Sequence, residues 1–310
     1  MATVALHSEI EPLKDMIPIG DINAETLPLL QAANWGEPPE LSNSVERTDH
    51  VIDNNTGVRV RVHTPVGLES LAPCVYSMHG GGYIGGTLDI DDPTFDKWCP
   101  QFGIIGVSVD YRIAPETQYP EPLEDCYKGL QWTYDNAAAL NIDRNKIGIT
   151  GTSAGGGLCA SLALLNRDRH NLPVSFQLLD CPMLDDRQIT PSSQLDNLII
   201  WTKASNAFGW QCYLGDLYGT DQVPYTAAPA RAEDLSGLPE AYVCVGGADG
   251  FRDEDIQYAM RLYGAGVPTE LHVYPGVPHG IGMFAHLEIA QRYAADKEHW
   301  LHRQLKQLQS

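Results

Sequence analysis

A serine in the pattern G-x-S-x-G is the first residue of this sequence that is placed to do chemistry. Residues 151–155 read GTSAG, with Ser153 at the centre, between an apolar run at 146–150 and a helical stretch that begins at Ala154. A sharp strand-to-helix turn holds such a serine in a strained conformation and exposes its oxygen at the helix N-terminus, where the dipole favours negative charge. Ser153 is therefore the candidate nucleophile, and the alternative is a glycine-rich turn with a passive serine.

A glycine-rich segment follows another apolar run, and it fits the same chemistry. Residues 79–82 read HGGG directly after the run at 74–78. Acyl transfer passes through a tetrahedral oxyanion that needs preorganised N–H donors, and glycines let the backbone present them without side-chain obstruction. HGGG loops act together with the N–H of the residue after the nucleophile, here Ala154. No G-x-x-x-x-G-K-[ST] pattern follows, so a phosphate loop is disfavoured, and His79 is expected to brace the loop.

A serine nucleophile needs a base and an orienting acid, in the chain order Ser, Asp or Glu, His. Asp249 follows the strand-like run at 241–245, and His279 follows the run at 269–274 through a Gly/Pro-rich loop. Asp253 and Asp255 compete for the acid's role, but we expect both in the first turn of the next helix, where carboxylates favour the dipole.

The elements that must position these residues follow from the hydrophobic pattern. Two strand-like runs flank a turn at residues 54–57 and predict a β-hairpin, and from Pro73 strands and helices alternate, which is typical of a mostly parallel sheet. The predicted strands cover 74–78, 104–109, 146–150, 174–179, 241–245 and 269–274, and the predicted helices 93–102, 123–134, 154–169, 253–263 and 285–307.

Two segments break that alternation. Short helical stretches at 8–17 and 25–33 precede the hairpin, and residues 184–230 form an apolar insertion with little strand pattern. The insertion is interpreted either as a lid over the active site or as ordinary core helix.

At this point the sequence resembles the hormone-sensitive-lipase-like carboxylesterases of the α/β-hydrolase fold, over nearly the whole chain from about residue 40. The matching stretches are 79–82 (HGGG), 110–116 (DYRIAPE), 151–157 (GTSAGGG) and 275–280 (PGVPHG). One stretch departs from the family pattern: the acid motif, typically DPLRD, here reads DGFRD at 249–253. The first Asp and the Arg-Asp pair are retained, so Asp249 stays the candidate acid.

The resemblance implies a role for each matching residue. Ser153 is implied as nucleophile, His279 as general base and acid, and Asp249 as its orienting acid, while the 110–116 stretch is implied to brace the HGGG loop through its charged residues. The implied oxyanion-hole donors are Gly81, Gly82 and Ala154.

The resemblance also implies an arrangement of domains. Residues 1–45 would form N-terminal cap helices, 46–183 and 231–310 the α/β-hydrolase catalytic domain, and 184–230 a helical cap insertion. The candidate pocket residues, each with core or cap packing as its alternative, are Tyr83, Trp201, Phe208, Trp210, Ile281 and Met283.

Composition limits the partners. Forty Asp and Glu against twenty Lys and Arg give a net charge of −20, which repels phosphate backbones and disfavours nucleic acid and anionic membranes. No apolar run reaches the ~18 residues of a membrane span, and acidic residues stand where a signal peptide would need an apolar region, so we expect a cytoplasmic protein. The seven cysteines, with no C-x-x-C pair, are predicted to be structural, with neither a disulfide framework nor a metal site.

We therefore predict a carboxylesterase that acts on small esters with short to medium acyl chains and needs no metal or cofactor. Dimers occur in the family, so a homodimer is compatible with the resemblance. Three alternatives stay open: a lactone, carbamate or amide hydrolase with the same triad, a non-catalytic small-molecule binding protein of the same fold, and, more weakly, a dehydratase.

Overall fold

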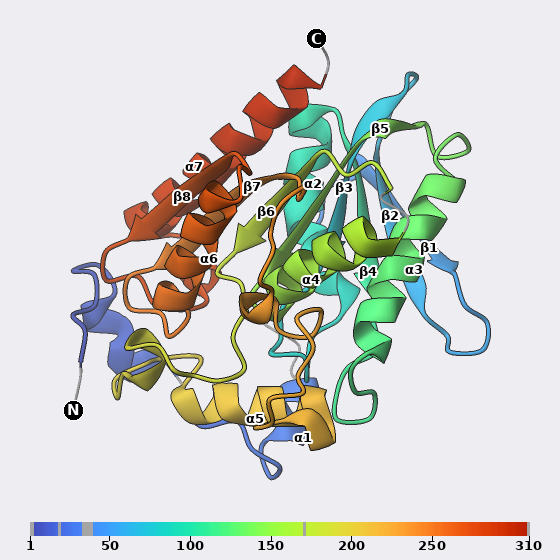
Figure 1. Cartoon of the computed structure of the whole chain (residues 1–310). Helices are drawn as coiled ribbons and strands as arrows, with labels where there is room; N and C mark the ends of the chain where they lie inside the picture. The colour runs from blue at the N-terminus through green and yellow to red at the C-terminus, as the bar shows by residue number, and fades with distance from the viewer. Residues whose placement is uncertain (1–2, 18–19, 33–39, 170–171, 309–310) are drawn as a thin grey trace.

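An eight-stranded sheet forms the centre of the protein. The computed structural model describes residues 3–17, 20–32, 40–169 and 172–308 (Figure 1). The strand order is β1-β2-β4-β3-β5-β6-β7-β8. The strands are β1 (Val45–Val51), β2 (Arg59–Pro65), β3 (Ala72–Met78), β4 (Ile105–Asp110), β5 (Ile142–Thr152), β6 (Phe176–Asp180), β7 (Glu240–Gly246) and β8 (Thr269–Tyr274).

The helices alternate with the strands, as the hydrophobic pattern predicted. The α-helices are α1 (Leu27–Ala32), α2 (Asp92–Phe102), α3 (Glu121–Asp135), α4 (Ala154–Arg169), α5 (Lys203–Leu214), α6 (Arg252–Gly264) and α7 (Glu288–Gln307). The 3-10 helices are η1 (Glu11–Met16), η2 (Leu88–Asp91), η3 (Ser192–Gln194), η4 (Gly215–Leu217), η5 (Pro229–Arg231) and η6 (Ile281–Phe284).

The sheet is antiparallel only at its β1 end. The predicted hairpin is confirmed, because β1 pairs antiparallel with β2 from Val45 opposite Pro65 to Val51 opposite Arg59. The next pair, β2 with β4, is also antiparallel, and all remaining neighbours are parallel. The expected α/β fold with a mostly parallel sheet is therefore confirmed.

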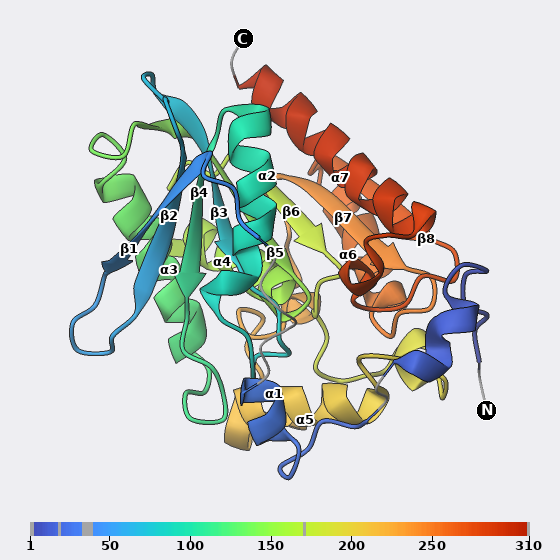
Figure 2. The same ribbon diagram turned by 180° about the vertical axis from the view of Figure 1, so that it is seen from behind.

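Helices cover both faces of the sheet, and Figures 1 and 2 show the two layers from opposite sides. Helices α3, α4 and α6 pack on one face, and α2 and α7 on the other. Every residue of the central strand β3 is buried, as expected for a strand covered on both faces.

Three predicted helices differ from their sequence ranges. Residues 8–17 form only the 3-10 helix η1, in which Pro12 occupies one of the first two positions. The stretch at 25–33 is helical over Leu27–Ala32, and Ala33 lies outside the described residues. The predicted helix at 285–307 begins at Glu288, after the separate turn η6.

The N-terminal segment and the insertion meet beyond the carboxyl ends of the parallel strands. Helices α1 and α5 lie side by side there in both views (Figures 1 and 2). Asn197 exchanges two hydrogen bonds with the backbone of Val4, and the Ser205 hydroxyl accepts the N–H of Ile22. We call these two segments, residues 3–32 and 192–214 without the undescribed 18–19, the cover.

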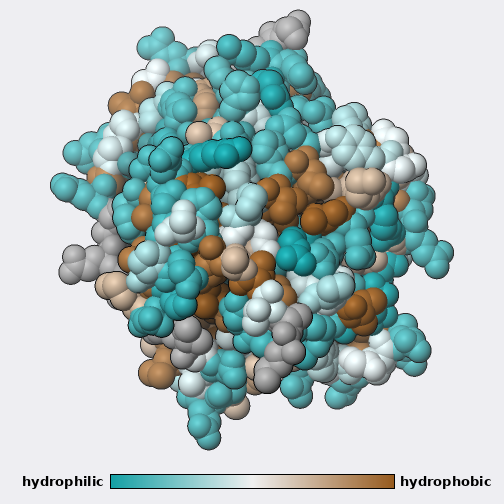
Figure 3. Space-filling view, turned by 90° about the vertical axis from the view of Figure 1, so that its left-hand side faces the viewer, coloured by the Kyte–Doolittle hydropathy of each residue, from teal (hydrophilic) through white to brown (hydrophobic). Residues whose placement is uncertain are grey.

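The surface seen in Figure 3 is mostly hydrophilic, with separate apolar patches set into it. Large exposed apolar side chains of the chain include Met16, Val273 and Met283. None of the described helices combines the length and apolar character that crossing a membrane requires.

Candidate active site

Ser153 lies in the turn between β5 and α4 with φ +60, the left-handed region that a residue with a side chain rarely adopts. Its N–H donates to the carbonyl oxygen of Asp180 at the end of β6, at 2.8 Å. The flanking glycine is required by space, because a Cβ at Gly155 would lie 2.0 Å from the carbonyl oxygen of Met78. The turn thus fixes Ser153 between the ends of β3, β5 and β6.

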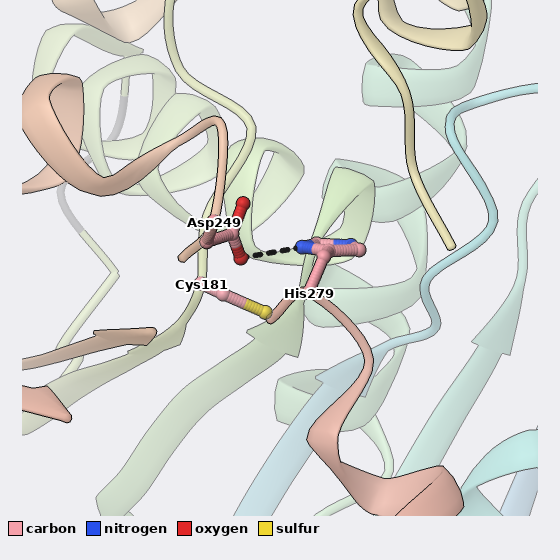
Figure 4. Close-up of side chains that lie close together, drawn as sticks. All are labelled: Cys181, Asp249 and His279. Carbon is pink, nitrogen blue, oxygen red and sulfur yellow. Dashed lines mark hydrogen bonds and ion pairs between the residues drawn. The ribbon is translucent and has the colours of Figure 1, made fainter. Parts of the chain in front are cut away.

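His279 and Asp249 reach Ser153 from the loops after β8 and β7. The Ser153 Oγ lies 2.9 Å from His279 Nε2, and His279 Nδ1 lies 2.7 Å from Asp249 Oδ2 (Figure 4 shows the second pair). Asp249 Oδ1 also accepts the N–H of Phe251 at 2.9 Å, which orients the carboxylate. The structure therefore brings together all three residues that the sequence singled out, in hydrogen-bonded order.

All three side chains are buried, and the burial affects the charge of the imidazole. Burial alone would lower the pKa of His279, but the carboxylate of Asp249, through its charge and its hydrogen bond, outweighs it and raises that pKa above 6.5. The arrangement thus favours the protonated ring of His279.

The HGGG loop lies against the serine turn. A Cβ added at Gly80 would be 3.5 Å from Ser153 Cβ, and the loop bends with positive φ at Gly81 (+126°) and Gly82 (+62°). Among the described residues, no hydrogen bond joins the N–H of Gly81, Gly82 or Ala154 to another protein group. These donors are available to a ligand beside Ser153.

The loop is braced by neutral groups, which corrects the expectation that charged residues of the 110–116 stretch do so. His79 stacks on Tyr111 with ring centroids 4.2 Å apart, and the Tyr111 hydroxyl donates to the His79 carbonyl oxygen. Burial lowers the pKa of His79, so its ring is neutral. Arg112 instead binds Asp125 in α3, and Glu116 is exposed.

The cover places apolar side chains over this site. A Cβ added at Gly250, the residue after Asp249, would lie 3.0 Å from the Leu198 side chain. A Cβ added at Gly280, the residue after His279, would lie 3.2 Å from the Ile200 side chain. The ring of Trp201 lies directly against Gly82, where a Cβ would be 2.1 Å from it. Ile200 has φ +70, a strained conformation for a β-branched residue.

The candidate pocket residues fall into different environments. Trp201 is half-buried and contacts the HGGG loop, whereas Tyr83 and Trp210 are fully buried and pack with Tyr213. Phe208 is half-buried on α5. Ile281 is buried in η6, and Met283 in the same turn is exposed. Leu198 and Ile200 were not among the candidates, and their only signal was the apolar run at 198–201.

Polar groups are also buried behind the triad. Asp253 and Asp255 lie in the first turn of α6, as expected, but the burial of Asp255 and the position of Cys181 were not predicted. Asp255 is fully buried and both carboxylate oxygens have no partner among the described residues, so burial, with Glu254 and Asp249 nearby, raises its pKa well above the usual range. Asp180 is paired with Lys297 at 2.6 Å. Cys181 places its thiol beside Asp249 and His279, a mixed donor set that could hold a metal ion.

The chain is similar to known esterases over most of its length. A family model described as alpha/beta hydrolase fold matches residues 75–283. The carboxylesterase NlhH of Mycobacterium tuberculosis is 37% identical over 253 residues, which is 80% of this chain and 79% of that protein. The esterase LipI of the same organism is 37% identical over 237 residues, 75% of this chain and 73% of LipI.

Solved structures agree with these relatives. The structure of a bacterial heroin esterase superposes with a TM-score of 0.91 and 35% identity, over 97% of this chain and 98% of that one. An esterase from the archaeon Pyrobaculum calidifontis superposes with a TM-score of 0.82 and 28% identity, over 98% and 99% of the two chains. The chain belongs to the α/β-hydrolase family and is a carboxylesterase of its hormone-sensitive-lipase-like branch.

Proposed function

We propose that this carboxylesterase hydrolyses small esters through an acyl-enzyme on Ser153. The observation that carries the proposal is the hydrogen-bonded series from the Ser153 Oγ through His279 to Asp249, beside N–H groups without protein partners. Such a series is what activates a hydroxyl that is otherwise a weak nucleophile.

In the acylation step, Ser153 Oγ attacks the ester carbonyl while His279 Nε2 takes its proton. Asp249 holds the ring in the tautomer whose Nε2 is free to accept, and its charge stabilises the imidazolium. The N–H groups of Gly81, Gly82 and Ala154 would bind the oxyanion of the tetrahedral intermediate. His279 then gives the proton to the leaving alcohol.

In the deacylation step, His279 takes a proton from a water molecule, which attacks the acyl-Ser153 carbonyl. The same N–H groups bind the second oxyanion, and collapse of that intermediate releases the carboxylic acid and returns the proton to Ser153. Both half-reactions use residues of this chain alone.

The cover suggests the size of the acyl group. Because the ring of Trp201 lies against Gly82, little space remains beside the oxyanion loop, and we expect short to medium acyl chains. The net charge of −20 supports a neutral substrate, and a cytoplasmic location without nucleic-acid partners belongs to the same proposal.

The proposal is tested by Ser153→Ala. We expect kcat for p-nitrophenyl acetate to fall by about 10⁶, and a fluorophosphonate probe to label the wild type at Ser153 but not the variant. Near-normal hydrolysis by Ser153→Ala would refute the acyl-enzyme, and an unlabelled wild type would favour a binding protein. A panel of lactones, carbamates and amides separates the remaining hydrolase specificities.

A further inference from the structure

Cys181 is the first residue after β6, and it holds its thiol beside the triad. Its Sγ, a carboxylate oxygen of Asp249 and a ring nitrogen of His279 all lie within 4.8 Å of one another (Figure 4). All three side chains are buried, and among the described residues the thiol has no hydrogen-bond partner. We propose that Cys181, Asp249 and His279 form an inhibitory binding site for a soft divalent cation of the Zn²⁺ type.

The donor set is the one that zinc prefers. Thiolate, imidazole and carboxylate are its common ligands, and three protein ligands leave the fourth tetrahedral position to water. Metal–ligand bonds of about 2.0–2.3 Å place tetrahedral ligands roughly 3.3–3.8 Å apart. Donors already within 4.8 Å of one another therefore need only small side-chain movements to converge on one ion.

The surroundings of the thiol favour a cation. Besides Asp249, the carboxylate of Asp180 lies near the thiol, where it is paired with Lys297. The negative charge of Asp249 itself attracts a cation to the sulfur.

A cavity that no residue of the cover lines extends to Cys181. It has a volume of about 460 Å³, and Thr152, Cys181 and Gly280 are among the residues that line it. Residues of α2, η6 and α7 form its other walls, with Lys97 and Glu298 among them.

Binding would disable the triad by displacing protons. Zn²⁺ takes the place of the thiol proton, which goes to solvent, and His279 coordinates through Nδ1, so that its one ring proton moves to Nε2. The nitrogen that faces Ser153 then carries a proton and cannot accept another, while Asp249 is engaged by the metal. A chelator would remove the ion and restore the original tautomer. The loss of activity rests on the proposed function, whereas metal binding does not.

The test titrates zinc sulfate into the wild type, Cys181→Ala and Cys212→Ala, each compared with its own metal-free rate on p-nitrophenyl acetate. Cys212, a buried cysteine of α5 outside the cluster, is the matched control. We expect reversible inhibition of the wild type and of Cys212→Ala. Cys181→Ala should need at least about tenfold more zinc for half-inhibition. Cys181→Ser serves the same purpose if the alanine variant does not fold.

A second measurement needs no activity. Cobalt(II) added to Ser153→Ala should produce a sulfur-to-cobalt charge-transfer band in the near ultraviolet, absent when Cys181→Ala is combined with it. Equal zinc sensitivity of the wild type and Cys181→Ala, or no such band, overturns the proposal. If the wild type has no esterase activity but the band appears, the proposed function is refuted and the proposed metal site is retained.

Discussion

The carboxyl ends of the parallel strands, where Ser153, Asp249 and His279 meet, form the catalytic edge of the sheet. This edge and the two segments of the cover above it are held together by different kinds of contact. At the edge, backbone atoms meet: the N–H of Ser153 donates to the Asp180 carbonyl oxygen, and a Cβ at Gly246 would lie 2.1 Å from the carbonyl oxygen of Val277. The two segments of the cover are joined to each other by bonds that use side chains instead, such as the Thr202 hydroxyl that donates to Asp21 at 2.6 Å.

The two kinds of contact differ in how much movement they allow. Backbone contacts without room for a Cβ leave the triad one geometry, which acyl transfer requires within fractions of an ångström. Side-chain contacts between segments nearly two hundred residues apart can change without disturbing the sheet. We therefore expect edge substitutions to alter the chemistry, and cover substitutions to alter which substrates are admitted.

After Ser153→Ala, the largest expected effect at the edge comes from Asp249→Asn, which should lower kcat by about 10⁴ because the amide favours the wrong His279 tautomer. In the wild type, kcat/KM should fall on the acid side of a pKa above 6.5, since only neutral His279 accepts a proton. In the variant, the fall of kcat/KM should occur at lower pH, because the carboxylate that raises the pKa of His279 is gone. Stopped assays across the pH range measure both effects.

Asp253→Asn is the matched control, because Asp253 competed with Asp249 in the sequence and its carboxylate pairs with Arg252 outside the triad. It should retain kcat. A loss comparable to that of Asp249→Asn would mean that the acid has been misassigned.

A second edge prediction concerns Asp255, whose buried carboxyl has no partner among the described residues. Its pKa is raised in the folded state, so its protonated form is favoured there, and stability is lost as pH rises above the unfolded value of about 3.8. The free energy of unfolding of Asp255→Asn should therefore exceed that of the wild type by an amount that grows with pH, up to about 1–3 kcal/mol. Urea unfolding from pH 5 to 9 measures this difference.

The neighbouring Asp253→Asn should show the opposite sign. Despite partial burial, Arg252 and the N–H of Ser192 lower the pKa of Asp253, so its ionised form stabilises the fold above the unfolded pKa. If both variants follow the same pH dependence, Asp255 is not held protonated by the fold.

In the cover, Trp201→Ala should change specificity more than rate. Removing the ring opens space beside Gly82, and the ratio of kcat/KM for p-nitrophenyl octanoate to that for the acetate should rise about tenfold. Trp132→Ala on α3, where the ring packs on His50, is the control and should leave the ratio unchanged. An unchanged ratio in Trp201→Ala would place the acyl group elsewhere.

The same division explains what could be predicted from the sequence. Ser153, the HGGG loop and the ends of β7 and β8 were predictable, because close backbone approach demands glycine and the chain order of an acid and a base is constrained. Their assembly within hydrogen-bond distance follows from parallel strands ending at one edge.

The contacts of the cover were not predictable, because they join residues with no shared local pattern. Leu198 and Ile200 read as an apolar run that fits core or lid equally, and nothing local indicates that they lie on Gly250 and Gly280. The place of Cys181 beside the triad and the burial of Asp255 were not predictable for a related reason, because only the tertiary arrangement creates them.

The smallest expected effect tests whether the cover can loosen alone. Thr202 begins α5: its hydroxyl accepts the N–H of Ser205 at 3.1 Å and donates to Asp21. Thr202→Ala loses both bonds and should cost about 1 kcal/mol, confined to the cover. Amide exchange should therefore quicken in α5 while β3 and β5 keep their protection. Thr220→Ala also loses two hydrogen bonds of a hydroxyl, at an exposed site outside the cover, and should leave amide exchange in α5 unchanged. Equal loss of protection in the sheet would show that edge and cover unfold as one unit, and the distinction between them would fail.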